Sequence, residues 1–99
     1  MSVIRLFELA SVSFLSAPET ADKCRTEIEK KLLYSKKVEI DFSNVYVTVG
    51  FLEHLLIPLL RKRGDALLQH LFFANCSEAA EFSINQVVKS YQSNALSNN

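Results

Sequence analysis

The sequence has few of the residues that build common chemical sites: it contains two glycines, Gly50 and Gly64, and two cysteines in 99 residues. Phosphate-binding loops need several glycines close together so that backbone amides can approach the phosphate, and no such cluster is present. Cys24 and Cys76 lie far apart and form neither a CxxC pair nor a cysteine–histidine ligand pattern. The sequence therefore predicts no metal and no cofactor.

The chain also has no excess of charge, because eleven basic and eleven acidic side chains cancel at pH 7. A neutral protein has no long-range field to concentrate nucleic acid, so we expect no nucleic-acid partner. No stretch approaches the roughly 20 apolar residues of a membrane span. Arg5 and Glu8 also interrupt the first apolar run before it resembles the core of a signal peptide. The sequence predicts a cytoplasmic protein that binds no membrane.

The length and composition suit one folding unit. Hydrophobic residues make up 48% of the chain, which is enough to build one core without a disulfide or metal. We expect a single domain over residues 1–92, followed by a flexible tail over residues 93–99, where polar residues predominate.

The first third of the chain contains signals for strands and then for a helix. Residues 3–14 are rich in β-branched and aromatic residues, which predicts a hairpin that bends at Ala10 and Ser11. Ser16 and Glu19 have the spacing of a capping box at the start of a helix. Pro18 is tolerated in a first turn. The apolar stripe predicted for this helix consists of Ala17, Ala21, Cys24, Ile28 and Leu32.

The middle of the chain predicts a strand followed by a second helix. Val38, Ile40 and Phe42 alternate with polar residues, as in a strand with one buried face. Thr48 is placed to cap the helix that follows, since its hydroxyl can accept from an amide in the first turn. Pro58 predicts a kink inside this helix. The apolar face of the helix is so wide that it indicates a central position or a covered surface.

The last third predicts one more strand and one more helix. Gly64 suits the residue that ends the second helix. The apolar run over residues 67–73 is short enough for a buried strand, and Ser77 is placed to cap a third helix. The order strand–strand–helix–strand–helix–strand–helix indicates an α/β fold, with helices crossing between parallel strands.

Two segments resemble a known family. Residues 38–45, VEIDFSNV, are similar to a strand ending in Asp-Phe-Ser-Gly-Val, and residues 51–56, FLEHLL, are similar to the helix start that follows it in STAS domains. Such domains occur in bacterial anti-sigma-factor antagonists and sulfate transporters, and the chain most resembles prokaryotic STAS-like proteins of unknown function. The resemblance covers residues 3–92. It implies a mixed sheet of four to five strands with helices packed on one face.

The resemblance also implies a function exercised by docking. In antagonists of this type, the loop before the second helix carries a serine that a partner kinase with a histidine-kinase-like ATP site phosphorylates. Residues 48–51 replace the usual serines of that loop, so Thr48 is the candidate phosphoacceptor, although helix capping is the favoured interpretation. We expect a non-enzymatic regulatory module that docks through residues 48–56 on a protein, with a histidine-kinase-like ATPase as the candidate partner. The partner-binding residues predicted are Thr48, Val49, Gly50, Glu53 and His54.

Other interpretations have weaker support in the sequence. His54 has no nucleophile at a fitting spacing, and a structural role is favoured for His70. Asp41 either caps a turn or points into a cleft. A small-molecule sensor or a homo-oligomer, for instance a homodimer, is the alternative, suggested by the leucines of the second helix and by the pair Phe72 and Phe73.

Overall fold

The computed structural model describes the backbone of residues 1–97 and the side chains of residues 1–94. The elements follow one another as β1 (Ser2–Arg5), α1 (Leu6–Ala10), β2 (Phe14–Leu15), α2 (Pro18–Leu32), β3 (Val38–Asp41), β4 (Tyr46–Val47), α3 (Val49–Arg63), the 3-10 helix η1 (Gly64–Gln69), β5 (Leu71–Ala74) and α4 (Glu78–Ser97).

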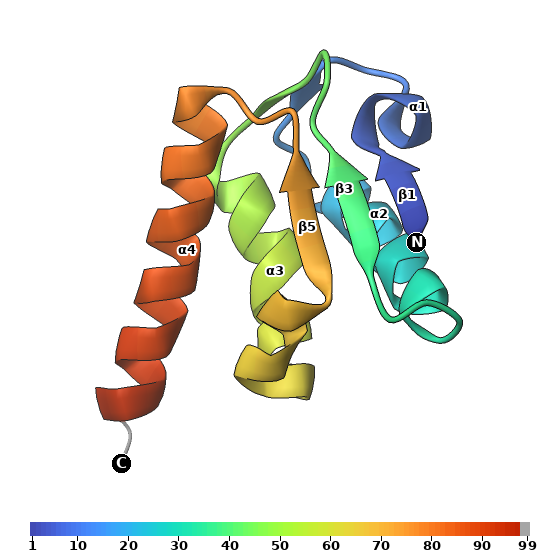
Figure 1. Ribbon diagram of the computed structural model, residues 1–99. Helices are drawn as coiled ribbons and strands as arrows, with labels where there is room; N and C mark the ends of the chain where they lie inside the picture. Colours follow the sequence, from blue (N-terminus) through green and yellow to red (C-terminus); the bar gives the residue numbers. More distant parts are fainter. Residues whose placement is uncertain (98–99) are drawn as a thin grey trace.

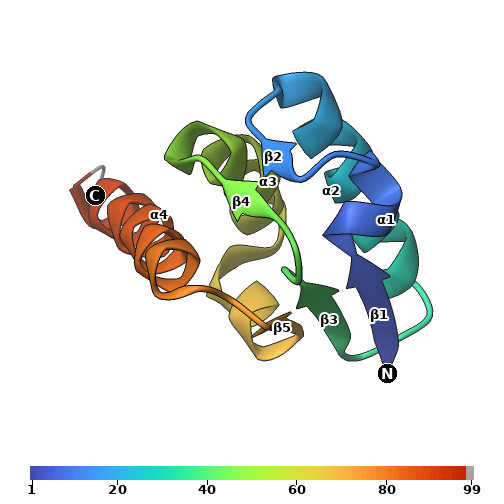
Figure 2. The same cartoon turned by 90° about the horizontal axis from the view of Figure 1, so that it is seen from above.

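The strands form two small parallel sheets. Three of them pair in the order β1-β3-β5, with Val38 opposite both Ser2 and Leu71. β2 and β4 form a separate pair, in which Phe14 lies opposite Tyr46 (Figure 2). The α/β class is as predicted, but the single mixed sheet of four to five strands is replaced by these two parallel sheets. Parallel pairing arises because helices return the chain to the same end before each new strand.

The predicted hairpin over residues 3–14 is wrong. The chain leaves β1 through the short helix α1, which ends at Ser11 with φ of 61° and an amide that donates to the Phe7 carbonyl at 2.8 Å. β1 pairs with β3 instead of its neighbour in sequence. Leu6 is fully buried, so burial of this side chain favours a helical turn where the sequence suggested a continued strand.

Helix α2 begins later than the capping box predicted. Its N-cap is Ala17, and no side chain caps it, so the proposed reciprocal bonds of Ser16 and Glu19 are absent. Pro18 does occupy the first turn, where its missing amide costs nothing. The buried face of α2 confirms the predicted stripe at Ala21, Cys24 and Ile28.

The alternation predicted for the third strand is confirmed. Val38, Ile40 and Phe42 are buried, on the face of the sheet that α2 and α3 cover (Figures 1 and 2). Within residues 1–97, no helix covers the opposite face of this sheet (Figure 2). Val3 and Phe72 both pair with Glu39, so the alternation of the strands places them on that face, and they are 39% and 41% exposed. Helices therefore pack on one face of the three-stranded sheet, as expected.

Helix α3 is the centre of the core. It packs against α2 on one side and α4 on the other, so its wide apolar face is covered within the chain. Burying each such leucine contributes about 1.5–3 kcal/mol. The helix continues through Pro58 and ends at Gly64, which has φ of 71°. Its buried residues are Phe51, Leu52, Leu55, Leu56, Leu59 and Leu60.

The C-terminal elements differ from the prediction at their boundaries. The apolar run over residues 67–73 is divided between η1 and the four-residue strand β5. The hydroxyl of Ser77 accepts from the amide of Ala80 at 3.0 Å, which confirms the predicted cap of the last helix. Helix α4 runs to Ser97 and so overlaps the tail expected over residues 93–99; residues 98–99 lie outside the described part of the chain.

Candidate partner-binding site at the start of helix α3

Thr48 holds the junction between β4 and α3. Its hydroxyl accepts a hydrogen bond from the amide of Phe51 at 3.1 Å, and its own amide donates to the carbonyl of Leu15 in β2 at 3.1 Å. The backbone is extended at Thr48 and helical from the next residue. The predicted helix cap is therefore confirmed, and it ties the start of α3 to the small β2–β4 sheet.

The five residues predicted to bind a partner lie together on the surface. We call Thr48, Val49, Gly50, Glu53 and His54 the rim. Val49 is 46% exposed, and Gly50, Glu53 and His54 are exposed as well, whereas Thr48 is partly buried. A β-carbon added at Gly50 would meet no atom closer than the Thr48 hydroxyl oxygen, at 4.0 Å, outside the adjacent residues and the helix backbone. Four of the five rim residues therefore lie on the surface, with space for a β-carbon at Gly50.

Two exposed aromatic residues adjoin the rim, and the sequence did not identify them. Phe14 in β2 and Tyr46 in β4 lie opposite each other, 62% and 70% exposed. Tyr46 is two residues before Thr48, so this pair borders the start of α3 (Figure 2). Alternation of Tyr46 with the buried Val45 predicts an outward side chain, but nothing in the sequence indicates that Phe14 becomes its neighbour.

Arg25 of α2 fixes the backbone behind the rim. Its guanidinium donates to the carbonyl of His54 and, at 2.7 Å, to the carboxylate of Asp22. The His54 carbonyl would normally accept from residue 58 of the helix, but Pro58 has no amide hydrogen. Arg25 supplies the missing donor, so α3 tolerates proline at this position.

Asp41 lies apart from the rim, at the carboxyl end of β3, and ties two turns together. Its carboxylate accepts from the amide and hydroxyl of Ser43, at 2.9 and 2.6 Å, and from the side chain of Asn75 at 2.9 Å. The pKa of Asp41 lies below its ordinary value, mainly because of the hydrogen bond from the Ser43 hydroxyl. The bonds from Asn75 and the Ser43 amide and the charge of Arg5 lower the pKa further, whereas burial raises it. This geometry matches the capping interpretation of Asp41.

The other polar candidates are used locally and do not meet. The ring of His70 contacts the Lys36 carbonyl at 2.7 Å, at the opposite end of the sheet from Asp41. His54 lies on the outer side of α3 and lines a depression there, whereas His70 lines a separate one near the end of α2. Within residues 1–97, no group of three or more His, Cys, Asp or Glu is placed to hold a metal ion.

Both cysteines are free, and burial raises the pKa of each. For Cys24, which belongs to the apolar stripe of α2, the pKa rises to about 11 in spite of the neighbouring charge of Lys23. Such a thiol is protonated at neutral pH and is a weak nucleophile. Cys24 is a core side chain, as its position in the stripe predicted.

A comparison with family models identifies the chain. The model for a STAS-like domain of unknown function (DUF4325) matches residues 20–81. The chain belongs to this family. The matched part of the STAS-like domain includes β3, the whole rim and α3, whereas β1 and β2 lie before it. Comparisons with curated proteins and with solved structures gave no match.

None of the helices within residues 1–97 has the length and apolar character needed to cross a membrane.

Proposed function

We propose that this STAS-like domain is a regulatory module that binds a partner protein through the rim and the adjoining Phe14–Tyr46 pair. The observation that supports this most is the position of two large, exposed aromatic side chains beside the capped start of α3. Tyrosine and phenylalanine are enriched at protein interfaces because they bury much apolar area at a low cost in conformational entropy.

The polar side chains of the rim, Glu53 and His54, add specificity to this surface. Glu53 and His54 are exposed beside Ile57 and Pro58 in a shallow depression on the outer side of α3. Charges at the edge of an apolar contact determine which partner fits and in what orientation. A rigid backbone under these residues, held by Arg25, lowers the entropy lost on binding.

A histidine-kinase-like ATPase is the partner that we propose, with Thr48 as its phosphoacceptor. The hydroxyl oxygen of Thr48 already accepts from the Phe51 amide, so a phosphate on it would lie at the positive end of the α3 dipole. Phosphorylation adds a charge of about −1.5 to −2. That charge beside Glu53 would change which partner surface fits the rim.

The test begins with site-specific photocrosslinking in the native cell. A crosslinking amino acid replaces Tyr46. The control protein carries the same amino acid in place of Tyr34, which is 87% exposed. Tyr34 lies in the turn between α2 and the start of β3, whereas Tyr46 follows the end of β3. The proposal predicts that position 46 captures an ATPase with a histidine-kinase-like domain and that position 34 does not. Equal capture from both positions, or a captured protein of another class, would contradict it.

Calorimetry with the purified ATPase then measures the contribution of the rim. We expect Tyr46→Ala to weaken binding about tenfold or more, as for an aromatic anchor, and Tyr34→Ala to leave it unchanged. Gly50→Trp is a second variant, because Gly50 is exposed and a β-carbon at this position has space. Wild-type affinity in both Tyr46→Ala and Gly50→Trp would remove the rim and the adjoining aromatic pair from consideration.

The alternative function was a small-molecule sensor or a homo-oligomer, and it was suggested mainly by the leucines of α3. The leucines of α3 that suggested an oligomer lie in the core of a single chain, where α2, α4 and the sheet cover them. Phe72 is partly exposed on the open face of the sheet, with the ammonium group of Lys37 5.3 Å from its ring centroid. No feature of α3 therefore calls for a second copy of the chain.

A further inference from the structure

The outer edge of β5 carries backbone groups that no strand pairs within residues 1–97, because β5 is the last strand of its sheet. On the inner edge, the amide of Val38 in β3 donates to the carbonyl of His70 at 2.8 Å. Successive residues of a strand point their backbone groups to alternate sides. The N–H and C=O groups of Leu71 and Phe73 therefore point away from β3.

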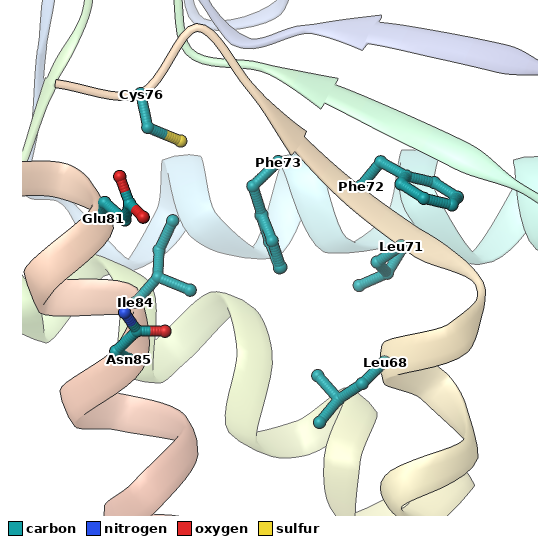
Figure 3. Close-up of a pocket in the computed structure, with 8 residues that line it drawn as sticks. All are labelled: Leu68, Leu71, Phe72, Phe73, Cys76, Glu81, Ile84 and Asn85. Atoms are coloured by element: carbon teal, nitrogen blue, oxygen red, sulfur yellow. The ribbon is translucent and has the colours of Figure 1, made fainter.

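A groove runs along this edge. It has a volume of about 480 Å³ and lies between β5 and the first turns of α4 (Figure 3). Leu71 and Phe73 from the strand and Ile84 from the helix form its apolar lining, and Glu81 and Asn85 stand on the helix side. Unpaired strand edges beside an apolar lining are the surfaces to which extended peptides add as further strands.

Helix α4 is held in place by α3, so it leaves the groove open. The two helices pack together, and the hydroxyl of Tyr91 donates to the carbonyl of Leu60 at 3.1 Å. The Ser77 cap fixes the start of α4 in the same way. No backbone–backbone hydrogen bond joins β5 to α4 within residues 1–97. The groove is thus a preformed feature of the fold.

The end of the groove beside Cys76 is negatively charged. Glu81 lines the groove, and the carboxylate of Asp41 lies close enough to act on the same thiol. Burial raises the pKa of Cys76 most, and the charges of Glu81 and Asp41 raise it further. The lining within the groove contains no basic residue. A positively charged side chain would therefore complement this end of the groove.

We propose that this groove binds an extended segment of a partner protein, which adds to β5 as a fourth strand and places a lysine or arginine beside Glu81. The backbone groups of Leu71 and Phe73 provide the hydrogen bonds, and alternate apolar side chains of the segment cover Phe73 and Ile84. The β5 strand of a second copy of the chain fits poorly, because its sequence, LFFA, has no basic residue. A second copy would also bring a second Glu81 carboxylate to the groove, where the two negative charges repel. The groove shares no residue with the rim, so the two surfaces act independently.

The test is selection from an unbiased display library of twelve-residue peptides on the immobilised full-length protein. Asn85→Trp is the matched control, because this exposed position lines the groove and a bulky side chain there closes it. We expect enriched peptides with alternating apolar residues and at least one lysine or arginine, and none of them bound by Asn85→Trp. Failure to enrich any peptide over that control would overturn the proposal, as would enrichment of acidic peptides alone.

Two further measurements distinguish strand addition from other binding. Amide hydrogen exchange by NMR should show the amides of Leu71 and Phe73 protected when the selected peptide binds; unchanged exchange would overturn strand addition. Glu81→Gln should weaken the affinity for the selected peptide roughly two- to fivefold, as expected for an exposed ion pair.

Protection of the amides of Leu71 and Phe73 by dimer formation in the free protein would assign the groove to a second copy of the chain instead. Tyr46→Ala should bind the peptide normally, so failure of the rim proposal leaves this one intact.

Discussion

The guanidinium of Arg25 donates to the backbone carbonyl of His54, the acceptor that Pro58 leaves without its partner in α3. The contact joins two helices through a backbone group, and Asp22 orients the guanidinium from the same side. It explains how a proline can occupy the middle of the central helix without interrupting it.

This relationship predicts a coupling between two distant positions. Arg25→Met keeps most of the aliphatic stem but removes the donor, and should lower the free energy of unfolding by about 1 kcal/mol. In a Pro58→Ala background, where residue 58 again donates to the His54 carbonyl, the same change should cost less. Urea denaturation of the four proteins of this double-mutant cycle measures the coupling. Strictly additive effects would show that Arg25 does not substitute for the proline amide.

The cap of α3 predicts a ranking of substitutions at Thr48. Thr48→Ala should lower the free energy of unfolding by about 1 kcal/mol, because the Phe51 amide loses its acceptor. Thr48→Ser and Thr48→Asp should stay within a few tenths of a kcal/mol of the wild type, since both side chains cap well. Chemical denaturation measures all three. A stable Thr48→Ala variant would mean that the hydrogen bond contributes nothing to the fold.

Asp41 predicts a dependence of stability on pH. Its folded pKa lies below the ordinary value of 3.8, so the ionised carboxylate stabilises the native state above that pH. The stabilisation should decrease as the pH falls through 3.8 toward the folded pKa. The difference in unfolding free energy between wild type and Asp41→Asn should therefore be largest near neutral pH and shrink in acid. Ser43→Ala removes the hydrogen bond from the Ser43 hydroxyl to Asp41, so its unfolding free energy should differ from that of the wild type by less, with the same dependence on pH. A difference between wild type and Asp41→Asn that does not change with pH would contradict this account.

The burial of Cys24 predicts that its thiol reacts slowly in the native protein. It is fully buried and its pKa is raised to about 11, so iodoacetamide should modify it only when the chain unfolds. A Cys76→Ser background isolates this signal. Mass spectrometry at pH 8 should show a labelling rate that rises with urea as the unfolded fraction rises. Rapid labelling without denaturant would place Cys24 in a locally open part of α2.

Local patterns were enough to predict several elements. The alternation of Val38, Ile40 and Phe42, the apolar stripe of α2, and the caps at Thr48 and Ser77 depend on neighbours within a few residues in sequence, and each is confirmed. Glu53 and His54 are exposed, because the polar residues of α3 face away from its apolar side.

Other features depended on contacts between distant parts of the chain. Residues 3–14 have the composition of two strands, but burial of Leu6 and pairing of β1 with β3 produce a helix between them. The strands β2 and β4 have two residues each, too few for a periodic signal, so their pairing was not predictable. The aromatic pair beside the rim results from that pairing alone.

The sequence by itself determined which residues are apolar, where α2 and α3 present their buried faces and how α3 and α4 are capped, since hydrophobic periodicity and capping act over a few residues. Only the tertiary structure decided that Phe14 lies beside Tyr46, that Arg25 reaches the carbonyl behind Pro58, and that the edge of β5 faces a groove. These features require segments tens of residues apart to meet. Packing of the whole core, and no local preference, brings them together.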